Sequence, residues 1–170
     1  MNTTKKICIT ALGTALYVCV SMLLKIPIVN HMSLDLGYIV FAVYCYMYGS
    51  IIGGTVGCAG AFFVSLIATG WLGIEWPLGN LVAGLICGKV YTKTKDQKYA
   101  DIICIITTIV ALFIGIAIVK TVVACAIYSM PFWVKFAKNC IIFVIDAVVM
   151  CVGYLFAKVV TPRIMKGENK

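Results

Sequence analysis

The sequence has 170 residues, of which 63% are hydrophobic and 12% are charged, with a mean hydropathy of +1.07. Soluble domains average roughly 45–50% apolar and about 25% charged residues, and a soluble domain of this length could not bury so much apolar side chain. These values exclude soluble, disordered and fibrous proteins, so a lipid bilayer must be the solvent. A spanning helix needs about 20 apolar residues, which allows at most about six or seven spans and leaves no room for a soluble domain.

The net charge of +8 does not indicate nucleic-acid binding, because the basic residues lie in short runs at the ends of apolar segments. The nine cysteines stand singly without a C-x-x-C pair, and the sequence has one histidine, His31. Structural zinc sites usually show paired ligand spacing, and a free cysteine behaves as a small apolar residue. We therefore expect no metal, no cofactor and no nucleic-acid partner.

Six apolar segments predict six transmembrane helices in a single all-α domain that covers residues 1–170. Their approximate bounds are 7–26, 34–50, 51–73, 76–91, 101–128 and 133–161. The first segment is longer than a signal-peptide h-region of about 7–15 residues, so we expect a retained helix. Only Gly49 and Ser50 separate the second and third segments, which predicts a tight helical hairpin. Pro77 suits the first turn of the fourth helix.

The basic residues predict the orientation of these six spans. Ten of them lie on one side of the membrane: Lys5, Lys6, Lys89, Lys93, Lys95, Lys98, Lys158, Arg163, Lys166 and Lys170. Three lie on the other side, namely Lys25, Lys135 and Lys138, and Lys120 lies within a helix. Cytoplasmic loops carry the excess of lysine and arginine. We therefore expect a six-helix bundle in the cell membrane with both termini in the cytoplasm.

Small residues form stripes on two of the predicted helices. Gly49, Gly53 and Gly57 recur every four residues, so one face of the third helix lacks side chains and a neighbouring backbone can approach closely. Ala11 and Ala15 form a similar stripe on the first helix. The glycine stripe either packs within the subunit or fits against a partner.

Polar side chains in the last two segments indicate a second feature, because an ionisable group in hydrocarbon costs several kcal/mol unless it is paired or hydrated. Asp146 lies about 13 residues into the last segment, roughly 20 Å along a helix. Asn139 is seven positions earlier, on nearly the same face, with Lys138 beside it. Lys120 in the antiparallel fifth helix has a matching depth. Either Lys120 and Asp146 form a structural ion pair, or these groups line a polar pocket open to the outside.

The loop before the fourth helix adds Glu75 and Trp76, with Asn80 one turn later. Small planar ligands use aromatic walls with a few convergent polar groups. Trp71 is interpreted as an interface anchor, and Asp35 with Lys25 as a surface pair rather than a gate. The sequence has no P-loop, H-E-x-x-H or G-x-S-x-G motif. We therefore expect a protein that is not an enzyme and does not hydrolyse ATP by itself.

With these residues in view, the chain resembles the substrate-binding S-components of energy-coupling factor (ECF) vitamin transporters over nearly its whole length. Asp35 near the start of the second helix and the aromatic-Gly-x-x-x-Gly-x-x-x-Gly run over 48–57 carry the resemblance. Ala11 and Ala15 match the alanine motif that such proteins use against a transmembrane coupling subunit. Ser50 stands where many members carry a proline.

The resemblance implies high-affinity binding and uptake of a vitamin or similar micronutrient. The substrate would bind near the outer face among helices four to six, and the protein would then dock on a transmembrane coupling subunit with two cytoplasmic ATPases and topple in the bilayer. The residues matched to the pocket are Glu75, Trp76, Asn80, Lys120, Lys138, Asn139 and Asp146. Riboflavin, another B vitamin and a modified-base precursor all remain open as substrates, and the coupling module is either dedicated or shared.

The alternative function is a structural membrane scaffold of the rod-shape-determining type, which has a similar length and helix count. Such a scaffold would bind no small molecule, and Lys120 and Asp146 would only pair with each other. A membrane enzyme acting on lipid would need a nucleophile or metal cluster near the interface, and the sequence suggests none.

Overall fold

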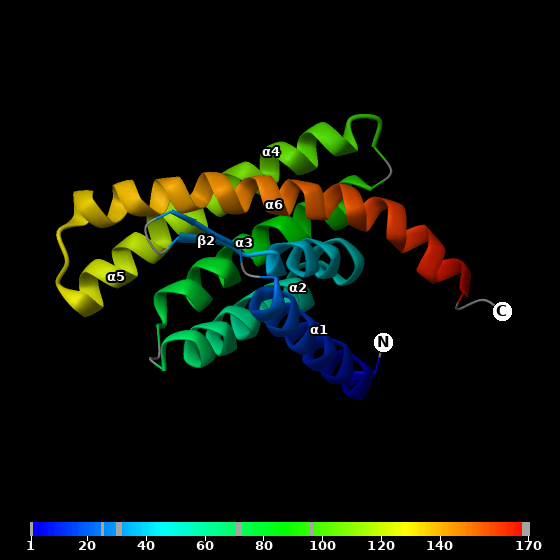
Figure 1. Ribbon diagram of the computed structural model, residues 1–170. Coiled ribbons are helices and arrows are strands. Elements are labelled where there is room, and N and C mark those ends of the chain that lie inside the picture. Colours follow the sequence, from blue (N-terminus) through cyan, green and yellow to red (C-terminus); the bar gives the residue numbers. More distant parts are fainter. Residues whose placement is uncertain (1, 25, 30–31, 71–72, 96, 168–170) are drawn as a thin grey trace.

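The computed structural model describes residues 2–24, 26–29, 32–70, 73–95 and 97–167, and these residues are mainly helical (Figure 1). In chain order the elements are α1 (Thr3–Leu23), β1 (Ile26–Val29), β2 (Met32–Leu34), α2 (Gly37–Thr69), α3 (Glu75–Thr94), α4 (Ala100–Leu112), the π-helix η1 (Phe113–Val119), α5 (Lys120–Tyr128) and α6 (Phe132–Gly167). Figure 1 shows both termini and the α3–α4 connection toward one end of the bundle, and the start of α3 and the α5–α6 connection toward the other.

Four helical stretches of the described chain are long and apolar enough to cross a membrane: Thr3–Leu23, Gly37–Thr69, Ala100–Tyr128 and Phe132–Pro162. Helices suit apolar surroundings because every backbone hydrogen bond is made within the segment. α3 is less apolar, and it packs against α2, α4, η1 and α5. The less apolar helix therefore lies among the apolar ones, where its polar residues Glu75, Asn80 and Thr94 are buried.

The six-helix bundle predicted from the sequence is wrong in its number of helices. The described residues form five helices: α1, α2, α3, the unbroken run of α4, η1 and α5, and α6. The segments 34–50 and 51–73, predicted as two helices, belong to one helix, α2, which bends at Gly49 (φ 81°, ψ −165°). Glycine adopts positive φ without steric cost. One residue therefore redirects the backbone, and no polar loop is needed between the two apolar runs.

The bend folds the second half of α2 against its own first half and against α3. A Cβ atom on Gly53 would lie 2.6 Å from the sulfur of Cys45, and one on Gly84 would lie 2.6 Å from the Cα of Gly54. The glycine stripe therefore packs within the subunit, and at Gly53 and Gly57 any larger residue would collide with a neighbour.

Several of the largest fully buried side chains lie where α1 and both halves of α2 meet. Tyr17, Tyr38, Phe41 and Val56 are all at least 99% buried there. The ring centroids of Tyr17 and Tyr38 lie 6.3 Å apart, and those of Tyr38 and Phe41 lie 5.9 Å apart, in edge-to-face arrangements. Edge-to-face contacts are a favoured geometry for aromatic pairs.

The connection between α1 and α2 contains an antiparallel pair of strands, in which Ile26 pairs with Leu34 and Pro27 with Ser33. β2 also contacts α6, so this hairpin reaches across to the last helix (Figure 1). His31, Lys25 and Trp71, which the sequence analysis considered, lie outside the described residues.

Candidate functional site

Three charged side chains are buried among the residues that the structure describes. Glu75 is 8% exposed, and Lys120 and Asp146 are each 2% exposed. They come from α3, α5 and α6, and Glu75 and Lys120 each begin their helix. We call Glu75, Lys120 and Asp146 the charged cluster. Because buried charge is costly in a membrane bundle, such groups mark substrate or ion pathways.

The ammonium group of Lys120 lies over an aromatic ring. Its Nζ atom lies 2.9 Å from the centroid of the Trp76 ring. A desolvated cation–π contact of this kind contributes about 2 kcal/mol or more. Within the described part of the chain, Lys120 and Asp146 do not form a direct ion pair, although their charges interact. The ion pair considered from the sequence is thus replaced by a contact with Trp76.

The π-helix η1 precedes Lys120 directly and lies against α3. A Cβ atom on Gly79 would lie 2.6 Å from the carbonyl oxygen of Gly115 in η1 and 3.7 Å from the Cβ of Lys120. The two glycines therefore allow η1 and α3 to pack backbone against backbone. π-helical turns occur often at functional sites. This close approach places Lys120 beside the first turn of α3, which carries Glu75 and Trp76.

Two hydrogen bonds connect the helices around the charged cluster. The Tyr128 hydroxyl donates to Glu75 Oε2 at 3.3 Å, and Asn139 Nδ2 donates to Thr121 Oγ1 at 2.8 Å. Asp146 differs from these residues, because its Oδ2 atom is buried and has no hydrogen-bond partner among the described residues. Buried polar atoms are nearly always hydrogen-bonded, so an exception needs a functional or structural explanation.

Asn80 belongs to a neighbouring hydrogen-bond network. Its Oδ1 accepts from the Tyr38 hydroxyl at 2.9 Å, and its Nδ2 donates to the Tyr17 hydroxyl and to the Gly57 carbonyl at 3.5 Å each. The network joins α1, α2 and α3. Tyr38 also lies close enough to Asp146 for the two side chains to interact. Asn80 therefore supports the cluster through a tyrosine.

Asp35, just before the start of α2, is connected to this network through Tyr17. It accepts hydrogen bonds from Ser21 Oγ at 2.6 Å, from the Gly37 amide at 2.8 Å and from the Tyr17 hydroxyl at 3.4 Å. The sequence interpretation of Asp35 as a surface pair with Lys25 involves a residue outside the described chain. In the part that is described, Asp35 ties α1 to α2.

The structure brings together Glu75, Trp76, Lys120, Asn139 and Asp146 of the sequence-predicted binding residues. Lys138 is exposed on α6, although its neighbour Asn139 is buried. The sequence analysis missed Tyr38, Thr121 and Tyr128. Thr121 and Tyr128 stand on the same short helix as Lys120, so a search for hydroxyl groups near each buried charge could have found them. Tyr38 lies far from these residues in the sequence and carries no such signal.

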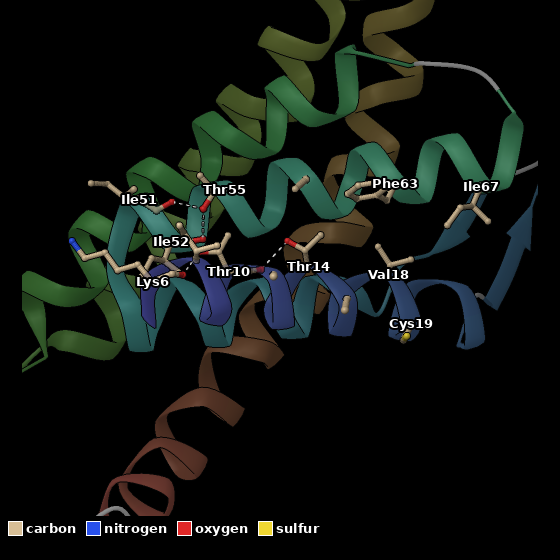
Figure 2. Close-up of a pocket in the computed structure, with 14 residues that line it drawn as sticks. Lys6, Thr10, Thr14, Val18, Cys19, Ile51, Ile52, Thr55, Phe63 and Ile67 are labelled. Atoms are coloured by element: carbon tan, nitrogen blue, oxygen red, sulfur yellow. Dashed lines mark hydrogen bonds between the residues drawn. The ribbon is translucent and has the colours of Figure 1, made fainter. Parts of the chain in front are cut away.

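A separate groove of about 780 Å³ runs between α1 and the second half of α2. Figure 2 shows its side chains from Lys6 at one end to Ile67 at the other. Ala11 and Ala15 line it, and both are exposed. The hydroxyls of Thr14 and Thr55 hydrogen-bond to carbonyls of their own helices at 2.8–2.9 Å. Because these polar groups are satisfied internally, the groove is apolar and suits a packed helix or lipid.

Comparison with known proteins relates the chain to one family. The profile described as "ECF-type riboflavin transporter, S component" matches residues 1–161. A UPF0397 protein of Aliivibrio salmonicida is 30% identical over 162 residues, which cover 88% of this chain and 86% of the relative. A UPF0397 protein of Streptococcus agalactiae is 26% identical over 158 residues, 89% of this chain and 87% of the relative. A UPF0397 protein of Streptococcus thermophilus is 30% identical over 87 residues, so the match spans only about half of that relative, 48% of its length.

The fold is similar to that of a solved S-component. A crystal structure described as the S-component for biotin from an ECF-type ABC transporter superposes with a TM-score of 0.63 and covers 95% of both chains. The sequence identity is 14%, so this likeness concerns the fold alone.

Proposed function

The chain belongs to the family of ECF-type riboflavin transporter S components, and from this premise we propose that it binds a vitamin or similar micronutrient and passes it across the cell membrane with energy from ATP. Members of this family are integral membrane transport proteins that bind substrate and are not enzymes. The four apolar helices agree with a multi-pass membrane protein. Family membership leaves the rod-shape scaffold without support.

The observation that carries the proposal is the burial of Glu75, Lys120 and Asp146 at one end of the bundle. A buried charged cluster that includes a carboxylate oxygen without a partner among the described residues suits a polar ligand and would be costly in a scaffold that binds none. We assign ligand contacts to these three residues, with Trp76 as an aromatic wall and Asn139 beside them. Lys138 is left out of the proposed site because its side chain is exposed.

The proposed partners are a transmembrane coupling subunit and two cytoplasmic ATPases. The 170 residues contain no P-loop motif, so ATP hydrolysis falls to other subunits in this proposal. The apolar groove along Ala11 and Ala15 is the proposed docking surface for the coupling subunit. Small residues support this assignment, because they allow a partner helix to approach the backbone of α1 closely.

Mass spectrometry of small molecules bound to the purified protein tests this function. The full chain, purified in mild detergent, should release one small molecule on denaturation in near-equimolar amount. Its Asp146→Asn variant should retain much less of it. Wild-type protein that stays folded but carries and binds no micronutrient would contradict the proposal.

A further inference from the structure

Asp146 offers a hydrogen-bond acceptor that the described protein does not use. Its side chain is 2% exposed, and its Oδ2 atom has no partner among the described residues. An ionised carboxylate only accepts hydrogen bonds. A buried acceptor without a donor carries a desolvation penalty, and a ligand that supplies the donor removes that penalty. Glu75 and Asn139 differ in this respect, since each already has a hydrogen bond.

The charges around Asp146 also select the ligand. The charged cluster contains one cation and two anions, so its formal net charge is −1. Lys135 and Lys138 of α6 also act on Lys120, but Lys138 is exposed and Lys135 is half-buried, so solvent screens their charges. Asp35, which is half-buried, adds a third carboxylate whose charge acts on Asp146. Interactions between charges are strong where water is excluded. An additional anion is therefore repelled, whereas a cation or a neutral donor is attracted.

Lys120 does not reverse this preference. Its ammonium group already lies over the Trp76 ring, and its charge interacts with both Asp146 and Glu75. An entering carboxylate would compete with two resident carboxylates for a single ammonium group. It would also leave Asp146 Oδ2 without a donor, so the main cost of the empty site would remain.

From these contacts we propose that the site takes a ligand whose buried end is neutral or cationic and carries an N–H or O–H group that donates to Asp146 Oδ2. Ligands that bring a carboxylate to this position are rejected. The inference rests on the proposed function, because it specifies the ligand chemistry of the same site.

Equilibrium dialysis of the purified full chain against a defined mixture tests the inference. The mixture holds matched pairs that differ in charge, nicotinamide with nicotinate and pyridoxamine with 4-pyridoxate, together with riboflavin and thiamine. The expected result is retention from the neutral or cationic group only, with affinity at least about tenfold lower for Asp146→Asn. Asp101→Asn is the matched control, because it removes a carboxylate at the other end of the bundle and should leave binding unchanged.

The named outcomes separate the two proposals. Retention of a carboxylate member in preference to its partner would overturn the inference while leaving the transport function intact. The same conclusion follows if a folded Asp146→Asn variant binds as tightly as the wild type. The charge preference is measured on the wild-type protein, so it decides the matter even if the variant does not fold. If the wild type retains no member of the mixture and also carries no micronutrient on purification, the proposed function itself is contradicted. If a micronutrient outside the mixture co-purifies, dialysis is repeated with it and with its matched pair, and a carboxylate at the end that Asp146 contacts overturns the inference.

Discussion

The two ends of the bundle differ in the exposure and the hydrogen bonding of their charged side chains. Near the termini, Asp101 of α4 accepts hydrogen bonds from Lys158 Nζ at 2.7 and 2.8 Å and from the Tyr154 hydroxyl at 2.9 Å. The side chains of Lys158 and Asp101 are 49% and 46% exposed. At the other end, Asp146 is buried and one of its oxygens has no partner among the described residues. Satisfied, exposed charges hold helices together, whereas buried and incompletely partnered charges are available to a ligand.

The aromatic rings of the two ends differ in what they pack against. At the terminal end, the ring of Tyr91 lies 5.0 Å from that of Tyr154, and Lys95 Nζ lies 4.4 Å from the centroid of Tyr46. These tyrosines pack mainly against one another. At the end with the charged cluster, the half-buried ring of Trp76 contacts the buried ammonium group of Lys120. Both ends contain carboxylates, lysines and aromatic rings. The burial of the charged side chains and the completeness of their hydrogen bonds therefore distinguish the candidate site from the Asp101–Lys158 pair.

A substitution in the α1–α2 groove, away from the charged cluster and from the Asp101–Lys158 pair, has the largest expected effect on uptake. Ala15→Trp fills the α1–α2 groove and should reduce uptake by cells that express the complete transporter to background. Ligand affinity should stay unchanged, because Ala15 is exposed and distant from the charged cluster in the chain. Uptake of the labelled ligand and binding by the purified variant are the two measurements. Leu16→Trp, on an exposed position outside the groove lining, is the control. Normal uptake by Ala15→Trp would remove the groove from the docking proposal.

The next effect concerns the packing that places Lys120. Gly79→Ala puts a Cβ 2.6 Å from the Gly115 carbonyl oxygen, so the backbones of α3 and η1 must separate. We expect a loss of about 1–3 kcal/mol of stability, typical of overpacking, together with weaker ligand binding. Thermal unfolding and a binding titration provide both values. Gly54→Ala is the matched control, since its new Cβ has no neighbour closer than 3.4 Å. Equal stability of the two variants would mean that the glycine contact does not position Lys120.

Removal of the buried ammonium group sharpens the contrast between the two ends. Lys120→Met keeps most of the side-chain volume but removes the cation–π contact and the buried cation that interacts with Asp146 and Glu75. We expect about tenfold weaker ligand binding, which corresponds to roughly 1.4 kcal/mol. Lys138→Met, the exposed control on α6, should bind like the wild type. Binding titrations of both variants are sufficient, and equal affinities would remove Lys120 from the site.

The smallest effect is expected at the terminal end. Asp101→Asn breaks an ion pair whose two side chains are about half exposed, and exposed ion pairs contribute little. The melting temperature should fall by about 2 °C or less, and ligand affinity should not change. If Asp101→Asn weakened binding as much as Asp146→Asn, the functional distinction between the two ends would fail.

Several features followed from the sequence because they depend on local chemistry. Apolar content alone required a membrane-embedded helical protein, since only internally hydrogen-bonded segments are stable in lipid. The spacing of Asn139 and Asp146 placed both on one face of a helix, and both are buried. The depth of Lys120 along its helix likewise put it at the level of Asn139, whose amide bonds to the residue after Lys120.

Other features were decided only by tertiary structure. The number of helices depended on the backbone conformation of one residue, Gly49. The apolar pattern on either side of Gly49 does not indicate that conformation. The partner of Lys120 depended on how closely α3 and η1 approach, and the contact between Gly79 and Gly115 allows Trp76 to take the place of Asp146. The exposure of Lys138 depended on the rotation of α6, which packing against α2, α4, η1 and α5 determines. Periodicity specifies which residues share a face, but the neighbour that covers each face is specified by side-chain packing between distant segments.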